Sequence, residues 1–396
     1  MAAPVVIAGA GPVGLTTALT LAQRGIEVRV LEQRPGAVQD PRATTVQPPV
    51  LEVLDDLGVL HELLGRGTRV DRIQYWDLPQ RSLLADLDLG LLAADTRHPF
   101  RLHVPQAEVV DVLVGALTAV QPDALHYGRK VVGFVDRGSD IAVDADTGGV
   151  RTQLEGAFLV SAEGTRSGVR EELGIGMDVA HTPVAFVSAR AELSLVDALQ
   201  QHLGPVAPQV AGVAYVLHDD GWATVMTMTD HVRVLLPATT DDPQSSLSRE
   251  TMAAQAEAIL GTGWGVEIES LALYHVWQRV AKAYRAGRVL LAGDAAHSAW
   301  PIGGTSMNFG MLDGWHLARA IADGSEVAID AYAENRRDEA SRMLLSGADS
   351  LLHVVDPWGM WERNVRRRLL QAVSSDPVEA RRHLQQLSLL PVSNPA

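Results

Sequence analysis

The stretch PVVIAGAGPVG, from Pro4 to Gly14, decides the fold of this chain of 396 residues. Residues 4–8 are apolar and mostly β-branched, which is typical of a buried parallel strand. The glycines that follow, Gly9, Gly11 and Gly14, have the spacing G-x-G-x-x-G. In dinucleotide-binding folds the first glycine allows a tight turn, the second lets the backbone approach a pyrophosphate, and the third lets helix and strand pack closely.

The residues after these glycines complete a strand–helix–strand unit. Apolar residues at helical spacing continue over about 13–24, and Gly25 is placed to end that helix. Residues 27–31 predict a second strand with Glu32 at its end. A helix N-terminus offers free N–H groups to phosphates, and an acid about 20 residues after the glycines accepts ribose hydroxyls. The unit therefore predicts a site for FAD or NAD, and Glu32 disfavours the 2′-phosphate of NADP there.

Composition excludes several other classes of protein. The formal net charge is −15 at pH 7 and no extended basic cluster is present, so a nucleic-acid partner is not expected. The chain has no cysteine, which excludes disulfides, thiolate zinc sites and Cys-ligated clusters, and no metal site is expected. No apolar run reaches the roughly 20 residues that span a bilayer, and no basic region marks a secretory signal. We therefore expect a cytoplasmic protein without a membrane span.

The chain beyond the second strand departs from a plain dehydrogenase. Residues 41–49 are expected to form a loop and residues 50–57 a helix, whereas residues 72–89 alternate about a central turn and predict a hairpin. A helix is expected at 106–120, and short strands separated by turns fill 183–282. We therefore predict an inserted, mostly antiparallel sheet that interrupts the nucleotide-binding fold.

Two later motifs each follow an apolar strand. The first is AEGTRSGVR, residues 162–170, and the second is GDAAH, residues 293–297, with PIGGTSMN at 301–308. Together with the glycine stretch, these motifs resemble the single-component aromatic-ring flavin monooxygenases of the p-hydroxybenzoate hydroxylase fold. The most similar members are the hydroxylases of aromatic polyketides. The resemblance covers about residues 4–340.

The resemblance implies an FAD site assembled from all of these motifs. Glu32 would hold the adenosine ribose, Asp294 would accept hydrogen bonds from the ribityl chain, and Val131 would offer its backbone to the adenine. Residues 301–308 would set a helix N-terminus against the flavin N1–C2=O edge, where free N–H groups stabilise the negative charge of reduced flavin. The full expected set is Gly9, Gly11, Pro12, Val13, Gly14, Glu32, Gln33, Arg34, Arg42, Gln106, Val131, Glu163, Gly164, Gly293, Asp294, Pro301, Gly303, Gly304, Thr305, Ser306, Met307 and Asn308.

The resemblance also implies an activity. NAD(P)H would reduce the FAD transiently, O2 would add at C4a, and the C4a-(hydro)peroxyflavin would hydroxylate a small aromatic substrate of phenolic or polyketide type. No catalytic side chain is assigned, and Pro301 is expected beside the reaction face. The alternatives are a Baeyer–Villiger or epoxidising enzyme, a non-oxygenating flavin oxidoreductase and a non-catalytic FAD-binding protein. Glu163 and Ser306, where the family usually has aspartate and glycine, together with the bulky Trp300, motivate the last of these.

The predicted architecture is α/β: a Rossmann-like FAD-binding fold, an inserted substrate sheet and a helical C-terminal tail. The FAD-binding domain would comprise residues 1–71, 100–170 and 283–340, the substrate domain residues 72–99 and 171–282, and the tail residues 341–396. A monomer or homodimer is expected. His297 is expected to pack at a helix start. Candidates for a base that deprotonates the substrate are His218, Tyr215, Tyr274 and His275, and candidates for an apolar pocket are Trp222, Met226, Met228 and Trp277.

Overall fold

The N-terminal strand–helix–strand unit is confirmed. Strand β1 (Val5–Ala8), helix α1 (Pro12–Ala22) and strand β2 (Val28–Glu32) follow one another, and the two strands pair in parallel. Gly25, with φ of 76°, lies in the left-handed region just after the helix. This is a computed structural model, and it describes residues 3–37, 43–205, 207–219, 221–238, 248–260, 270–298, 304–345 and 363–392.

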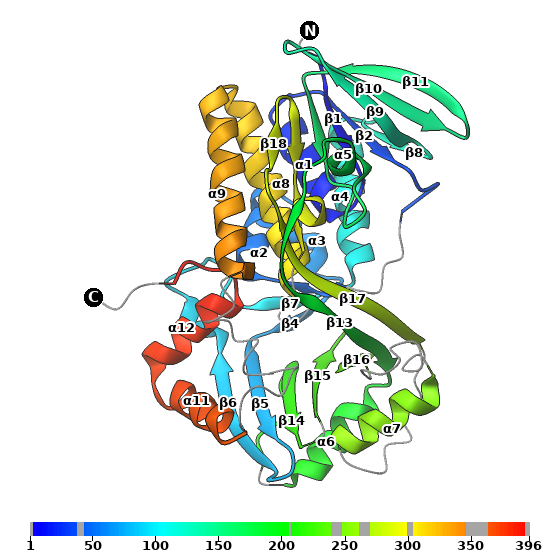
Figure 1. Ribbon diagram of the computed structural model, residues 1–396. Coiled ribbons are helices and arrows are strands. Elements are labelled where there is room, and N and C mark those ends of the chain that lie inside the picture. The colour runs from blue at the N-terminus through cyan, green and yellow to red at the C-terminus, as the bar shows by residue number, and fades with distance from the viewer. Residues whose placement is uncertain are drawn as a thin grey trace.

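The unit belongs to a six-stranded sheet with the order β18-β19-β12-β1-β2-β8. The added strands are β18 (Arg285–Ala286), β19 (Val289–Leu291), β12 (Phe158–Ser161) and β8 (Leu125–Tyr127). All pair in parallel except β18, which is antiparallel to β19. Helix α1 packs between α4 (Gln106–Val120) and α8 (Thr305–Asp323), as Figure 1 shows in the upper half of the molecule. The predicted Rossmann-like fold and the helix at 106–120 are confirmed.

Two small sheets flank this core. Strands β9 (Lys130–Asp136), β10 (Ile141–Thr147) and β11 (Val150–Gly156) form an antiparallel sheet that projects at the top of Figure 1. Strand β7 (Arg101–His103) pairs with both β3 (Thr45–Val46) and β4 (Thr68–Val70). The prediction of a loop at 41–49 is therefore wrong for its second half. Residues 45–46 pair with β7, and helix α2 (Pro48–Asp56) begins at Pro48. Proline suits the first helical turn, where its missing N–H would be unpaired in any case.

The largest sheet has eight strands in the order β20-β17-β13-β16-β15-β14-β5-β6. In that order the strands are His297–Ser298, Ser270–Ala281, Met177–Ala191, Val232–Pro237, Gly221–Thr227, Val213–His218, Arg72–Asp77 and Ser82–Asp88. Among these described strands only β14 and β5 pair in parallel, so the predicted antiparallel insertion and its hairpin at 72–89 are confirmed. The long strands β13 and β17 run from the nucleotide half into the lower half of Figure 1. The domain boundaries themselves stay a prediction.

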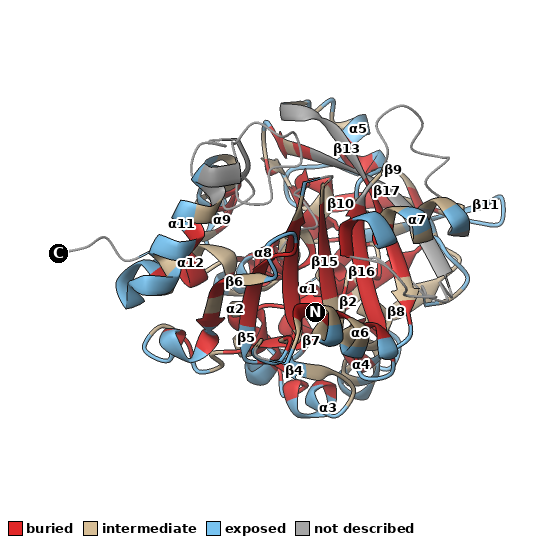
Figure 2. Ribbon diagram, turned by 90° about the horizontal axis from the view of Figure 1, so that it is seen from below, coloured by how far each residue is buried: buried red, intermediate tan, exposed pale blue. Residues whose placement is uncertain are grey.

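Helices cover the large sheet on two sides. Helices α6 (Ser194–Leu203) and α7 (Arg249–Leu260) share an apolar cluster with one face of β14–β16. The sequence pattern over 183–282 predicted only strands and did not predict these two helices. The tail helices α11 (Arg363–Ser375) and α12 (Pro377–Leu387) share a second cluster with β5, β6 and the opposite face. Figure 2 shows buried strands between these helices, whose outward sides are exposed.

The remaining elements connect these layers. They are α3 (Leu60–Leu64), η1 (Leu89–Leu92), α5 (Gly168–Glu172), η3 (Gly293–Ala295) and α9 (Glu326–Leu345). Helix α9 packs on α8 in the upper half of Figure 1, and η3 lies against the same helix. Within the described ranges, no helix is long and apolar enough to cross a membrane.

Candidate functional site

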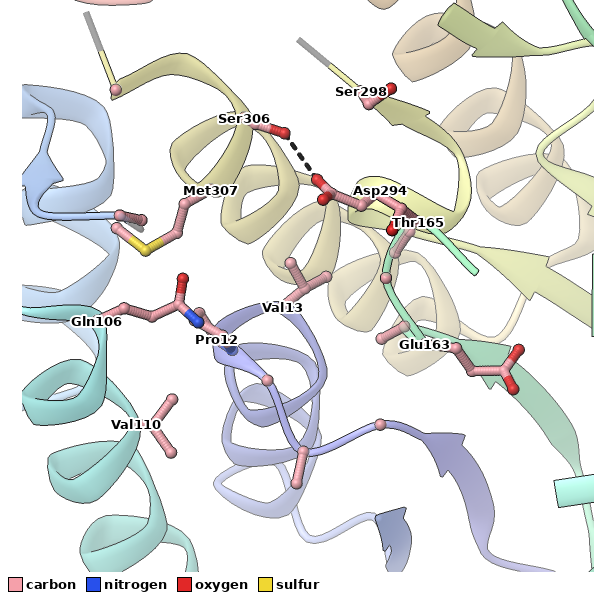
Figure 3. A pocket seen from close by; sticks show the side chains of 18 of the residues that line it. Pro12, Val13, Gln106, Val110, Glu163, Thr165, Asp294, Ser298, Ser306 and Met307 are labelled. Carbon is pink, nitrogen blue, oxygen red and sulfur yellow. Dashed lines mark hydrogen bonds between the residues drawn. The ribbon is translucent and has the colours of Figure 1, made fainter. Parts of the chain in front are cut away.

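A cavity of about 310 Å³ lies where the six-stranded sheet, the β3–β7 pair and the large sheet meet. Most of the expected FAD-binding residues line it, although their motifs are far apart in the sequence. Figure 3 shows that the start of α1, the start of α8 and the segment after β12 all border this space. The expected residues on its wall are Gly9, Gly11, Pro12, Val13, Glu32, Gln33, Arg34, Gln106, Val131, Glu163, Gly164, Asp294, Gly304, Thr305, Ser306 and Met307.

The glycines of the N-terminal stretch have two different environments: Gly9 and Gly14 are tightly packed, whereas Gly11 is open to the cavity. A Cβ on Gly14 would overlap the carbonyl oxygen of Gly9, and a Cβ on Gly9 would overlap that of Ala162 at the end of β12. These two glycines therefore let α1, the turn and the sheet approach one another. At Gly11 nothing lies within 4 Å of where a Cβ would be, and the residue faces the cavity. Backbone that is open in this way at a helix start is what a pyrophosphate requires.

Glu32 is fixed at the end of β2 by the backbone around it. The Ala10 N–H donates to Oε2 at 2.9 Å and the Arg34 N–H donates to Oε1 at 2.9 Å. The residue is only 5% exposed, yet it borders the cavity. Because an ionised carboxylate accepts about four hydrogen bonds, it retains capacity for two hydroxyls. These free acceptor positions suit the hydroxyls of an adenosine ribose.

Glu163 turns its carboxylate away from the cavity, as Figure 3 shows. Its Oε2 accepts hydrogen bonds from Ser161 Oγ at 3.0 Å, Ser167 Oγ at 2.8 Å and the Val169 N–H at 3.0 Å. The side chain therefore organises the start of α5, and the residue borders the cavity together with Gly164. The glutamate in place of the family's aspartate thus has well-defined partners.

Asp294 and Ser306 face each other across the cavity wall. Ser306 Oγ donates to Asp294 Oδ1 at 2.6 Å, the contact drawn in Figure 3. The serine at this family glycine position therefore holds the aspartate against the first turn of α8. Gly304, in the left-handed region with φ of 69°, precedes that turn, where a Cβ would lie 2.8 Å from the Cβ of Thr45.

Asn308 does not border the cavity. It is fully buried, and its Nδ2 donates to Thr45 O at 2.7 Å and Gly304 O at 2.6 Å, while its Oδ1 accepts the Gln47 N–H at 2.8 Å. The amide thus joins the start of α8 to β3. Gly14 and Gly293 likewise lie behind the wall rather than on it. Arg42, Trp300, Pro301 and Gly303 fall outside the described residues.

A buried ionic network centred on Asp313 is hydrogen-bonded to the start of η3. Asp313 is fully buried and accepts hydrogen bonds from the Gly293 N–H at 3.0 Å, His297 Nε2 at 2.6 Å and Arg336 Nε at 2.7 Å. Burial alone would raise the pKa of Asp313, but the charges and hydrogen bonds of His297 and Arg336 outweigh burial and lower that pKa below its ordinary value. His297 packs edge-on against Phe309 with ring centroids 4.8 Å apart, so its observed contacts are structural.

The other end of the cavity is one face of the large sheet. Two cross-strand rows border it, Tyr215–Thr224–Leu235 and Val213–Met226–Arg233. Tyr215 stacks on Tyr75, with ring centroids 5.0 Å apart. Arg101 from β7 completes this end. Its wall is therefore largely apolar, with a small number of polar groups.

The comparisons with known proteins agree with this arrangement. Residues 2–346 match the family described as FAD binding domain. The chain belongs to the FAD binding domain family. It is 29% identical to para-nitrophenol 4-monooxygenase of Pseudomonas sp. (strain WBC-3), over 84% of this chain and 82% of that protein. It is 31% identical to 6-methylpretetramide 4-monooxygenase of Streptomyces rimosus, over 86% of this chain but 60% of the relative.

Two solved structures have the same fold as this chain. The p-nitrophenol 4-monooxygenase of Pseudomonas putida gives a TM-score of 0.86 at 25% identity, with 98% of both chains covered. The anhydrotetracycline hydroxylase of Streptomyces rimosus gives 0.77 at 26% identity, with 100% of this chain and 77% of the other covered. The protein is a flavin-dependent monooxygenase, and the predicted family, fold, FAD cofactor and enzyme class are confirmed.

The residues predicted from the sequence for the substrate pocket agree only in part with those that line the cavity. Tyr215 and Met226 line the cavity, whereas His218, Trp222 and Met228 do not. The side chains of Tyr274, His275 and Trp277 fall outside the described set. Thr224, Arg233 and Arg101 were missed. Strict alternation from Met226 would have found Thr224, since residues two apart share a face of a strand, but no local signal marks Arg101.

Proposed function

We propose that this flavin-dependent monooxygenase hydroxylates an aromatic substrate of phenolic or polyketide type, with NAD(P)H as a transient reductant. The observation that carries the proposal is the shared cavity, in which Gly11, Glu32, Asp294 and the start of α8 border the same space as an apolar sheet face. Bound FAD supplies the electron transfer and oxygen activation, which no amino-acid side chain supplies. Two of the relatives are named para-nitrophenol 4-monooxygenase and 6-methylpretetramide 4-monooxygenase, and these names support the aromatic class.

The nucleotide end would bind FAD through groups of fixed geometry. The start of α1 and the backbone at Gly11 would face the pyrophosphate, Glu32 the ribose, and the Val131 backbone the adenine. Asp294 would accept the ribityl hydroxyls. The N–H groups at the start of α8, from Thr305 onward, would face the flavin N1–C2=O edge and stabilise negative charge there.

The substrate end would bind an aromatic ring and exclude water from it. Tyr215, Met226 and Leu235 present apolar surface on strands that α6 and α7 support from behind. Such a wall positions a ring and keeps water from the reacting atoms. The cytoplasmic location and the monomer or homodimer state stay predictions.

One experiment tests the proposal. The purified protein is reconstituted with FAD and its visible absorption recorded, after which NAD(P)H and O2 consumption are measured over a panel of phenols and polyketide-type aromatics. We expect a bound flavin spectrum and a product heavier by one oxygen atom, identified by mass. Absence of bound flavin, or consumption that yields only hydrogen peroxide with every aromatic, would overturn it.

The variant Asp294→Ala tests the ribityl contact. It removes the acceptor and leaves Ser306 Oγ without its partner, so FAD affinity should fall at least about tenfold. FAD content after gel filtration and a Kd from fluorescence quenching measure the effect. Ser306→Ala, which removes the donor but keeps the carboxylate, is the matched control and should retain most of the flavin. An Asp294→Ala protein that holds FAD like the wild type would sink this role.

Glu32→Ala should weaken FAD binding by about 1–3 kcal/mol, because hydrogen bonds to a charged group are lost. The Ala10 N–H also loses its acceptor, which acts in the same direction. The control is Glu27→Ala on the same segment, whose carboxylate instead pairs with Arg29 at the surface. Equal FAD affinities for the two variants in a titration would count against the ribose role.

A further inference from the structure

We propose that the substrate end of the cavity is built to bind a carboxylate through Arg101 and Thr224, so that the aromatic substrate carries a carboxylate group. The inference rests on the proposed function and narrows its substrate class. It concerns the end of the cavity formed by the large sheet, away from the glycine stretch.

Arg101 is buried, and no anionic side chain of the described residues pairs with it. The residue lies on β7 and is 1% exposed, yet it borders the cavity. Its one hydrogen bond to a described residue runs from Nη2 to Leu387 O at 2.8 Å, and its buried Nε has no partner among them. By contrast, Arg336 at 5% exposure donates to Asp313 and Glu339, and Arg170 at 5% donates to two backbone carbonyls.

Within the described residues this guanidinium has a backbone acceptor but no anionic partner. Arginine stays charged when buried, since its pKa is too high for deprotonation. Burying a charge without a partner costs several kcal/mol. The planar fork of N–H donors matches the two oxygens of a carboxylate, which is the commonest anion for this geometry. A carboxylate on a bound molecule would therefore supply the anionic partner that the described residues do not provide.

Thr224 supplies a second polar group at the same end. Its Oγ1 is buried, has no hydrogen-bond partner in the described part of the chain, and belongs to a residue that borders the cavity at 4% exposure. Its neighbours across the strands are Tyr215 and Leu235, which offer apolar surface. Among the described residues, Arg101 Nε and Thr224 Oγ1 are thus two unpaired polar atoms beside an apolar wall, and they fit a ligand that combines an aromatic ring with a charged oxygen group.

The positive charges of Arg101 and Arg233 act on the groups around this end of the cavity. Burial lowers the pKa of His103, which lies beside Arg101 on β7, to about 4, and the charges of Arg101 and Arg233 act in the same direction. His103 is therefore neutral at pH 7. The charge of Arg101 also acts on Tyr75 and His383, which belong to the large sheet and the tail helix. Arg101 thus acts on the sheet side of the cavity.

Binding of paired probes to the FAD-loaded, oxidised enzyme tests the inference. Each pair has the same hydroxylated ring system and differs only in a carboxylate against its primary amide, with benzene, naphthalene and anthracene rings. Isothermal titration calorimetry gives the Kd of each. The wild type should bind at least one acid about tenfold or more tighter than its amide. Arg101→Gln should remove that preference, because acid binding should weaken far more than amide binding.

Matched variants keep the test informative. Arg69→Gln on the adjacent strand β4 changes an exposed arginine that pairs with Asp71, and it should retain the wild-type preference. Should Arg101→Gln fail to fold by circular dichroism, Thr224→Val is measured instead and should reduce the preference severalfold. Acids that bind no tighter than their amides, or a folded Arg101→Gln that keeps the preference, would overturn the inference. A failure of the proposed function is separate, since it would appear as missing flavin or missing oxygenated product.

Discussion

Replacing Asp313 with alanine should lower the free energy of unfolding by about 3–5 kcal/mol, because it removes the fully buried partner of an ion pair with Arg336. Arg336 is 5% exposed and would lose the carboxylate that accepts its Nε. His297 and the Gly293 N–H would lose their acceptor as well. Since Gly293 begins η3, the loss should also displace the cavity wall at Asp294.

Urea denaturation of the wild type and the variant measures this effect. The matched control is Asp330→Ala, which removes an aspartate that pairs with Arg285 but is 61% exposed. Exposed pairs contribute about 0–1 kcal/mol, so this control should unfold close to the wild type. Equal losses in the two variants would show that the Asp313 network does not stabilise the fold.

The contribution of Asp313 should also depend on pH. Its pKa is lowered in the folded protein, so the stabilisation is fully present above the unfolded-state value of about 3.9 and is lost as pH falls through the folded value. The difference in unfolding free energy between wild type and Asp313→Ala should therefore be constant near neutrality and shrink in acid. A difference that grows below pH 4 would contradict the sign of the shift.

Gly14→Ala should abolish FAD retention and destabilise the fold by about 1–3 kcal/mol or more. The new Cβ would overlap the Gly9 carbonyl oxygen, and Gly9 is itself so close to Ala162 that a Cβ there would lie 2.4 Å from the Ala162 carbonyl oxygen. All the atoms involved are backbone, so no flexible side chain relieves the overlap. The turn that presents Gly11 to the cavity would move instead.

FAD content after reconstitution and the melting temperature check the Gly14 prediction. The control is Gly115→Ala, a glycine within α4 that has nothing within 4 Å of the place where a methyl group would lie. Alanine is favoured over glycine inside a helix, so this control should be neutral or slightly more stable. If Gly14→Ala bound FAD normally, the close helix–strand packing assigned to that glycine would be wrong.

The parts of the fold that could be predicted are mostly those that depend on the pattern of residues close together in the sequence. The glycine stretch, the helix at 106–120 and the hairpin at 72–89 depend on neighbouring residues, and all three are confirmed. Strand β3 was missed because residues 45–46 become a strand only by pairing with β7, much later in the chain. Helices α6 and α7 were missed because the surrounding strand signals dominated the reading of that segment.

The site was predictable as a set of motifs but not as a set of side-chain directions. The spacing from the glycines predicted Glu32 and the family resemblance predicted Asp294, and both border one cavity. It did not show that the carboxylate of Glu163 turns toward α5, or that the amide of Asn308 bonds to β3. These directions depend on partners contributed by other segments. Arg101 was invisible for the same reason, since the sheet and tail that bury it are distant in sequence.

Strands β13 and β17 have a consequence for engineering relatives of this protein. Their ladder extends from Met177 opposite Ala281, beside the nucleotide half, to Arg190 opposite Ser270 in the far half. A chimaera that exchanges the sheet of one monooxygenase for that of another must therefore cross this ladder twice. Crossover points at facing residues, such as Val187 and Leu273, would keep each graft paired with its own partner. A single crossover would splice two unrelated strands into one ladder and break its register.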